Sequence, residues 1–326
     1  MKLRAILTLA VMAVLLALFS FWMAKESYNW FPPQASAESR MLDDLFAIFT
    51  GLGTFILLGV TIPVIYSLIF HRAGKYDYSD GPPIEGNTIL EIVWTAVPIL
   101  LVAGLVTASY NTYVRMNLRG PMELVHLHMP ELVESAYAEP ILKPDERILD
   151  QAKPVAGDKI DASPATYIDV TAKQWAWIFR YPDQDITSTE LHLPVDRRVH
   201  LTLRSEDVLH GFYVPAFRVK QDVVPNHTID FEFTPIRTGT YRLRDSMFSG
   251  TYFAANQADV VVQSLADYQQ WLADAAAQTP SPAFNQAASE YNRSTNTMVH
   301  GWASIPPAPP PVVNYAPKQE PVSPPA

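Results

Sequence analysis

Metal binding is the first chemistry that the residue types raise, because the chain has eight histidines and no cysteine. Without a thiolate, it can form no disulfide and no iron–sulfur, zinc or copper site that depends on cysteine sulfur. The stretch HLHM, with His126, His128 and Met129, still offers imidazole and thioether ligands for copper. Two histidines at this spacing are more often part of an ordinary strand or loop, and we favour that interpretation.

A second reactive group is Glu91, which stands at the start of a long apolar run. Thr88 and Glu91 have the spacing of a capping box that opens a helix. A carboxylate at the mouth of a membrane-spanning helix is also a candidate for a proton path, because ionisable groups are costly there. The residues alone leave both interpretations open.

Three uncharged runs, at residues 5–24, 45–70 and 92–114, predict the elements that carry these groups. Each run reaches the roughly 20 residues that a helix needs to span a bilayer. Lys and Arg lie before the first run and between the second and third, so these ends are expected in the cytoplasm. Residues 1–115 are therefore a predicted membrane anchor, and everything after Arg115 is expected on the outer face.

The first run could instead be a secretory signal. The apolar part of a signal is usually about 7–15 residues long and is followed closely by an A-x-A cleavage motif. Here the motif Ala35-Ser36-Ala37 lies well downstream of the run. We therefore expect a retained anchor.

Residues 166–264 contain short runs rich in β-branched and aromatic residues, separated by turn signals. In residues 199–203 and 229–233 apolar and polar residues alternate, which predicts strands with one buried face. Strands that recur at this spacing predict a compact antiparallel sandwich or barrel.

The remaining segments carry no assigned chemistry. Residues 116–165 form a predicted connector or insertion, and residues 265–303 form predicted helices that open with a capping box at Ser264 and Asp267. Residues 304–326 hold nine prolines, so an extended or disordered tail is expected. The net charge of −9 argues against a nucleic-acid partner.

Three motifs together resemble subunit II of the haem–copper terminal oxidases. EIVWTAVP at 91–98 resembles the second membrane helix of that family, QWAW at 174–177 its aromatic motif, and SEDVLHGFYVP at 205–215 its first ligand loop. The resemblance covers about residues 45–114 and 166–275. It implies that the outer domain, residues 166–264, is an all-β cupredoxin-like sandwich attached to a membrane α-helical anchor.

Members of this family that oxidise cytochrome c hold a dinuclear copper A centre with two cysteines, two histidines and a methionine. Alignment on Gly250 places other residues at nearly all of these positions. They are Asp245 and Ser249 for the cysteines, Phe253 for the second histidine and Asn256 for the methionine, with Met247 for a magnesium-binding glutamate. Only His210 remains, and we expect it to be a structural remnant held by hydrogen bonds in its loop, with no metal in this chain.

The missing ligands imply the quinol-oxidising branch of the family, and DGPPIEGN before Glu91 resembles the cyanobacterial alternative respiratory terminal oxidases. The chain is then a non-redox subunit of an enzyme that couples quinol oxidation to O2 reduction and proton translocation. It should carry no cofactor, with the haems and copper in subunit I. The expected partners are subunits I and III, membrane lipid and quinol. The expected location is a bacterial plasma or thylakoid membrane, with the soluble domain in the periplasm or lumen.

The resemblance also favours a role for Glu91 at the start of a proton path over simple capping. Trp175 and Trp177 belong to the motif through which cytochrome c-using relatives pass electrons inward, and without copper A we expect them to serve packing. Two other functions fit the sequence. One is subunit II of an oxidase fed by cytochrome c or plastocyanin without copper A, and the other is a non-redox scaffold or assembly protein.

Overall fold

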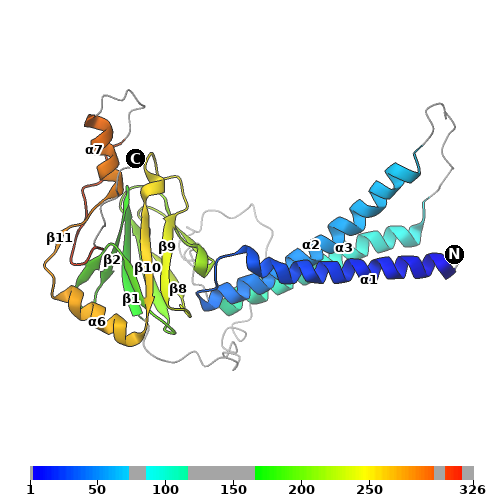
Figure 1. Ribbon diagram of the computed structural model, residues 1–326, viewed down its shortest axis with the longest axis horizontal. Helices are drawn as coiled ribbons and strands as arrows, with labels where there is room; N and C mark the ends of the chain where they lie inside the picture. The colour runs from blue at the N-terminus through cyan, green and yellow to red at the C-terminus, as the bar shows by residue number, and fades with distance from the viewer. Residues whose placement is uncertain (1–2, 73–85, 117–165, 297–304, 318–326) are drawn as a thin grey trace, which may run out of the picture. The chain divides into compact units, whose positions relative to one another are not determined.

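Figure 1 shows a computed structural model of the chain, which describes residues 3–72, 86–116, 166–296 and 305–317. The chain divides into two compact units. The first comprises residues 1–117 with 215–219, and the second comprises residues 118–214 and 220–326. The first unit contains the three apolar runs, and the second contains the strands.

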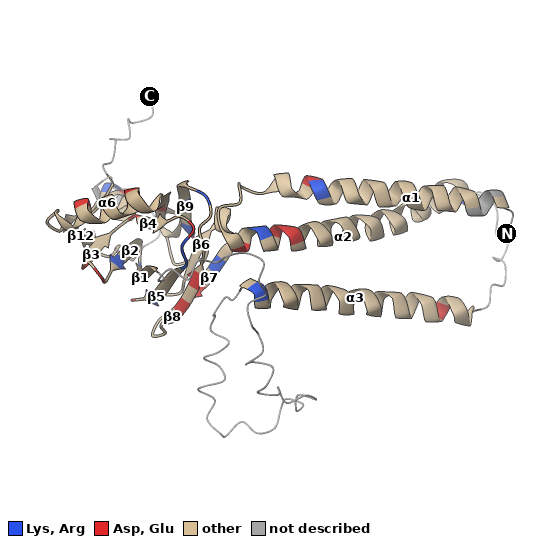
Figure 2. Ribbon diagram, turned by 90° about the horizontal axis from the view of Figure 1, so that it is seen from below, with Lys and Arg blue, Asp and Glu red and all other residues tan. Residues whose placement is uncertain are grey.

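Three helices carry the apolar runs of the first unit. They are α1 (Leu3–Glu26), α2 (Ala37–Phe70) and α3 (Thr88–Met116), with a short 3-10 turn, η1 (Ser27–Trp30), after α1. Each helix is long and apolar enough to cross a membrane, and nearly all of its apolar surface is exposed. Figure 2 shows that Lys, Arg, Asp and Glu lie near the helix ends and leave the middles uncharged. Three membrane-spanning helices are therefore confirmed.

The second unit is a sandwich of two five-stranded sheets, with the strand orders β3-β2-β1-β5-β8 and β4-β10-β9-β6-β7. The strands are β1 (Thr166–Lys173), β2 (Ala176–Tyr181), β3 (Ile186–Ser188), β4 (Leu191–Pro194), β5 (Val199–Ser205), β6 (His210–Val214), β7 (Val219–Val223), β8 (Ile229–Phe233), β9 (Gly239–Asp245) and β10 (Gln257–Gln263). The cupredoxin-like sandwich is confirmed.

The predicted alternation of the strands is present. Val199, Leu201 and Leu203 on β5 are fully buried, and Leu201 pairs with Phe231 on β8. The expectation of a wholly antiparallel sandwich is wrong. β1 runs parallel to β5, and β4 runs parallel to β10. Each of these pairs joins strands that are distant in the sequence, and only strands linked by a tight hairpin must be antiparallel.

Two helices follow the sandwich, α6 (Leu265–Ala276) and α7 (Gln286–Asn296). The Ser264 side chain accepts a hydrogen bond from Asp267 N at 3.2 Å and so caps α6 as predicted. Tyr268 and Trp271 on α6 are buried. The apolar face of α6 thus packs on the domain.

Residues 304–326 were expected to be extended or disordered, and residues 305–317, which we call the C-terminal clasp, are extended and held in place by contacts with the domain. Its strand β12 (Val312–Val313) pairs with β11 (Ser281–Pro282), and Tyr315 N donates to Thr187 O of the edge strand β3 at 3.0 Å. Proline cannot donate to a sheet, but it is tolerated beside an edge strand where its missing N–H faces away. The high proline content therefore did not indicate that this segment covers a sheet edge.

Candidate functional site

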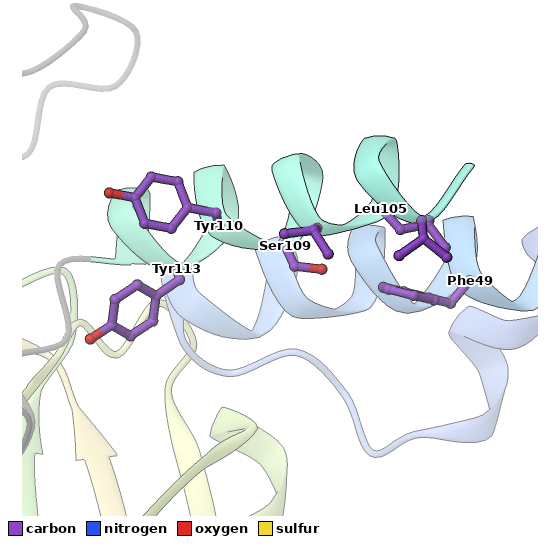
Figure 3. Close-up of a pocket in the computed structure, with 7 residues that line it drawn as sticks. Phe49, Leu105, Ser109, Tyr110 and Tyr113 are labelled. Atoms are coloured by element: carbon purple, nitrogen blue, oxygen red, sulfur yellow. The ribbon is translucent and has the colours of Figure 1, made fainter. Parts of the chain in front are cut away.

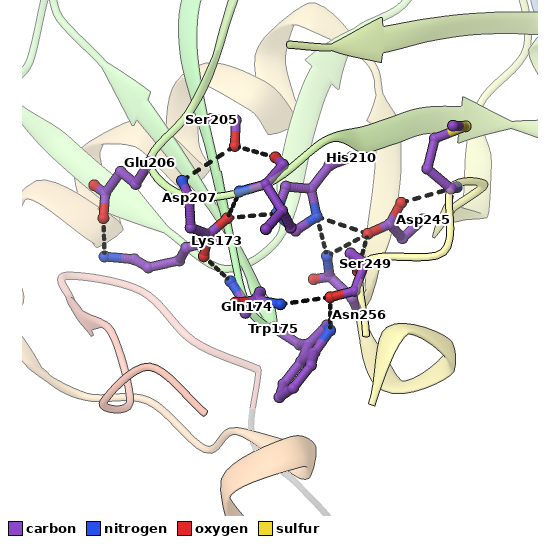
Figure 4. A network of polar contacts seen from close by, with 12 residues as sticks. Lys173, Gln174, Trp175, Ser205, Glu206, Asp207, His210, Asp245, Ser249 and Asn256 are labelled. Carbon is purple, nitrogen blue, oxygen red and sulfur yellow. Dashed lines mark hydrogen bonds and ion pairs between the residues drawn. The ribbon is translucent and has the colours of Figure 1, made fainter. Parts of the chain in front are cut away.

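His210 lies at the start of β6 and is fully buried. Each ring nitrogen contacts a carboxylate: Nε2 is 2.9 Å from Asp207 Oδ1, and Nδ1 is 2.7 Å from Asp245 Oδ2. Asp207 comes from the loop between β5 and β6, whereas Asp245 ends β9 (Figure 4). The imidazole therefore joins two separate loops, and we call these three residues the His210 cluster.

Asp245 is the centre of the His210 cluster, because its carboxylate accepts five hydrogen bonds. One comes from His210, and the others come from Ser249 Oγ at 2.9 Å, Asn256 Nδ2 at 3.0 Å, Gly211 N at 2.8 Å and Met247 N at 3.1 Å. The Asp245 side chain has no exposed surface. A single buried carboxylate thus organises the whole loop from residue 245 to residue 256.

The electrostatics of the His210 cluster favour a charged imidazole. Burial by itself would lower the pKa of His210, but the hydrogen bonds and charges of Asp207 and Asp245 outweigh burial and raise it to about 9. Burial would likewise raise the pKa of both carboxyls, yet hydrogen bonds from His210 and from backbone N–H groups lower them. At neutral pH the cluster is an imidazolium held between two carboxylates, and both ring nitrogens donate.

The residues of this site do not fit copper A. Copper centres that transfer electrons depend on soft thiolate ligands, and the two cysteine positions hold Asp245 and Ser249. Both His210 nitrogens already contact carboxylates, at 2.7 and 2.9 Å. Within the part of the chain that the structure describes, no group of three or more His, Asp or Glu side chains is arranged to hold a metal ion.

Three of the four substituted ligand positions do come together around His210. Asp245 and Asn256 contact the imidazole directly, and Ser249 donates to Asp245. The Asn256 side-chain oxygen is buried without a hydrogen-bond partner. Phe253 lies apart, with its ring 5.1 Å from that of Phe248, whose side chain is 77% exposed. Phe253, at the fourth substituted position, therefore contacts another aromatic side chain and not the His210 cluster.

The two tryptophans of the aromatic motif hold the backbone of the same loop. Trp175 Nε1 donates to Ser249 O, and Trp177 Nε1 donates to Asn256 O, each at 3.2 Å. Both indoles are almost fully buried. These contacts agree with the packing role that we expected.

Asp207 is the functional residue that sequence reasoning missed. It stands three residues before His210 in the motif SEDVLH, so a carboxylate close enough to reach the imidazole was visible in the sequence. The second carboxylate, Asp245, was noticed only as a substituted cysteine. The spacing of Asp207 was the available signal that His210 would be charged.

Glu91 lies in the first turn of α3 and is exposed. The predicted capping box of Thr88 and Glu91 is wrong, because Asn87 caps the helix: its side chain accepts from Leu90 N at 3.2 Å, and Glu91 N donates to Asn87 O at 2.9 Å. Asparagine is a stronger cap than threonine and stands one residue earlier. The Glu91 carboxylate is therefore not needed to cap α3.

The other sequence candidates add no second site. His126, His128 and Met129 lie outside the described residues. A groove between α2 and α3 is lined by Phe49, Val102, Leu105, Val106, Ser109, Tyr110 and Tyr113 (Figure 3). It is a largely apolar surface whose polar side-chain groups are the hydroxyls of Ser109, Tyr110 and Tyr113, and it presents no carboxylate or imidazole.

Comparison with known proteins gives two family matches. Residues 22–111 match the model described as cytochrome C oxidase subunit II, transmembrane domain, and residues 184–265 match the one described as cytochrome C oxidase subunit II, periplasmic domain. The β domain is therefore the soluble periplasmic part beyond the membrane anchor.

Similar proteins include subunits named for cytochrome c oxidases and for quinol oxidases. Cytochrome c oxidase subunit 2 of Thermostichus vulcanus is 34% identical over 79% of this chain and 82% of that protein. Its counterpart in Synechocystis sp. is 30% identical over 88% and 87%. Quinol oxidase subunit 2 of Bacillus spizizenii is 27% identical over 82% and 73%. The chain belongs to the cytochrome c oxidase subunit II family and is subunit II of a haem–copper oxidase.

Proposed function

We propose that the chain is the non-redox subunit II of a haem–copper oxidase that takes its electrons from quinol. One observation carries the proposal: Asp245, Ser249 and Asn256, which stand at copper A ligand positions, form a hydrogen-bonded network with His210 in place of a metal site. If the metal ligands were present and free, an absent metal could be added back to the site. Here the imidazole is already bound by Asp207 and Asp245, and no thiolate is available.

Quinol chemistry removes the need for a relay in this domain. Two quinols supply the four electrons that reduce one O2 to two waters, and they release four protons. A quinol dissolved in the bilayer can reach a site among membrane helices without crossing the periplasmic domain. The haems and the oxygen-reducing copper would belong to subunit I, with subunit III and lipid completing the complex. This chain would supply the anchor and a closed periplasmic domain.

The test of this proposal is a comparison of electron donors with the purified complex. We expect O2 consumption with a short-chain quinol and negligible consumption with reduced cytochrome c or plastocyanin. Soluble donors should be tried at low ionic strength, where charge-steered docking is strongest. Salt-sensitive oxidation of a soluble donor, with none of the quinol, would falsify the proposal.

Identity to relatives favours a second candidate. The two relatives at 34% and 30% identity are named cytochrome c oxidases, whereas the named quinol oxidase is 27% identical. On that basis the chain would serve an oxidase fed by a soluble carrier without copper A. We give the site more weight than overall identity, because the ligands decide whether copper A can form.

Glu91 is the residue of this chain that we propose to take part in proton uptake. Its carboxylate is exposed in the first turn of an apolar helix, and Asn87 relieves it of the capping role. We expect Glu91→Gln to slow turnover of the assembled complex, because it removes the titratable group. Glu91→Asp should retain most turnover.

Asn87→Ala is the matched control for Glu91. It weakens the cap by about 1 kcal/mol but keeps the carboxylate. If Asn87→Ala slows turnover as much as Glu91→Gln does, the effect comes from the helix end and the role in proton uptake is rejected. Full turnover of Glu91→Gln in an intact complex would reject it as well.

A further inference from the structure

The C-terminal part of the chain lies against the turn between β1 and β2. Ala308 N of the C-terminal clasp donates to Gln174 O at 2.6 Å, and Asn285 Nδ2, just before α7, donates to Trp175 O at 3.0 Å. Asn285 is itself buried. The two carbonyls of this turn are therefore occupied by segments from the far end of the chain.

Trp175 is closed off on several sides. Its indole donates to Ser249 O, the ring of Tyr252 lies edge-on at 5.1 Å, and only 2% of the residue is exposed. In Figure 4 the ring points away from the His210 cluster toward the ribbon of α7. Ala283 and Ala287, on either side of Asn285, are also buried. The C-terminal segments thus enclose this part of the turn.

This turn is the outer approach to the His210 cluster. Gln174 Nε2 and Trp175 Nε1 both donate to Ser249 O, and the Ser249 side chain donates to Asp245. A hydrogen-bonded route therefore runs from Trp175 through Ser249 to the position where the family carries its metal. Whatever covers Trp175 therefore closes this route between the surface and that position.

The covering segments lie beyond the two family models that match this chain. Both family matches end by residue 265, before α6, α7 and the C-terminal clasp. The clasp itself contains no Lys, Arg, Asp or Glu. Soluble electron carriers find their partners through complementary charge, and the uncharged clasp offers them none.

We propose that the C-terminal clasp and α7 are a specificity element that closes the Trp175 face of the periplasmic domain to water-soluble electron carriers. The inference rests on the proposed function, because an oxidase supplied from the membrane has no use for an open face there. The domain would then exclude soluble carriers in two ways, by lacking the metal and by a physical barrier over Trp175. Acidic groups lie next to the covered turn: Asp207 accepts from Gln174 N, and the exposed Glu206 pairs with Lys173 at 3.1 Å. Without the cover, a basic carrier could reach Trp175 beside these groups, on a chain whose net charge is −9.

The test compares two truncations in the purified complex. One ends at Ser304 and removes the C-terminal clasp, and the control ends at Pro317 and keeps it. Hydroxyl-radical oxidation of Trp175, read by peptide mass spectrometry, reports exposure, and Trp177 serves as the internal standard for an intact domain. We expect oxidation of Trp175 to rise several-fold only in the shorter chain. That chain should also gain salt-sensitive binding of reduced cytochrome c, while quinol oxidation is unchanged.

A finer variant keeps the test decisive if the shorter chain fails to fold. Ala308→Pro removes only the N–H that bonds Gln174 O in a segment already rich in proline, and Asn285→Ala removes the contact to Trp175 O. The pair should expose Trp175 in the same direction. If Trp175 stays protected in these variants, or becomes exposed without any binding of cytochrome c, the specificity role is overturned. Oxidation of cytochrome c by the unmodified complex would instead overturn the proposed function.

Discussion

Two buried histidines of the same domain are held in opposite ways. His210 lies between the carboxylates of Asp207 and Asp245, and the ring of Trp177 lies edge-on to it at 6.0 Å. His192 on β4 has one carboxylate, Glu190, at 3.1 Å from Nε2 and one amide oxygen, of Gln263, at 3.1 Å from Nδ1. Its ring stacks flat on Trp271, with centroids 3.9 Å apart and planes 7° apart.

The difference lies in which hydrogen bonds the partners of each histidine can make. Two carboxylates can only accept hydrogen bonds, so the His210 cluster is complete only when both ring nitrogens carry protons. A glutamine amide can present either its oxygen or its NH2 group, so the partners of His192 are not restricted to accepting hydrogen bonds. Charge secures the first histidine, and stacking between Trp271 and the edge of Tyr315 secures the second. At the position where copper A members of the family bind their metal, this chain thus has a charged cross-link, in which a protonated His210 joins two carboxylates.

Removal of Asp245 should have the largest effect on this comparison. Asp245→Ala leaves a buried imidazolium with one partner and frees two backbone N–H groups, so we expect a loss of about 3–5 kcal/mol in the free energy of unfolding of the domain. Denaturant unfolding of the full-length subunit in detergent, followed by the near-UV signal of its tryptophans, measures this loss.

Asp259→Ala is the matched control for that substitution. It removes a carboxylate from the neighbouring strand β10, where Asp259 pairs with Arg242 at the surface. We expect a change of at most about 1 kcal/mol. If both substitutions cost the same, the His210 cluster has no special part in stability.

The pH dependence of stability should show the charged state of His210. The folded pKa of about 9 lies above the value of 6.5 expected for an unfolded histidine. The stabilisation is therefore complete below pH 6.5 and is lost as the pH rises through 9. The size of the shift corresponds to about 3 kcal/mol.

His210→Gln should abolish most of this alkaline slope. A flat profile between pH 6.5 and 9 in the unmodified protein would show that the imidazole is neutral. On the acid side, the lowered pKa values of Asp207 and Asp245 mean that their contribution persists to lower pH than for ordinary carboxyls and is lost as they protonate.

The sequence was sufficient where a pattern is local or a motif is specific. Three uncharged runs predicted the membrane helices, alternation predicted β5 and β8, and the motif around His210 led to the sandwich and to the substituted ligands. The sequence was not sufficient to predict contacts between distant segments. The surroundings of His192 combine residues from β4, β10, α6 and the C-terminal clasp, and no spacing in the chain reveals that they meet. The clasp was missed for a related reason, since composition describes a segment but not the edge strand that it covers.

The smallest expected effect belongs to His192, and it separates stacking from charge. His192→Phe keeps a flat ring against Trp271 but removes both side-chain hydrogen bonds, so we expect a loss of about 1–2 kcal/mol. The Glu190 carboxylate, which is largely buried, would lose its imidazole partner and account for much of that loss. The double variant His192→Phe with Glu190→Gln should therefore recover part of the stability, because it leaves no unpaired charge. The same unfolding assay measures both. A loss for His192→Phe as large as that for Asp245→Ala, with no recovery in the double variant, would mean that hydrogen bonding and not stacking holds His192. The two histidines would then be secured in the same way, and the charged cross-link would no longer distinguish the former metal position.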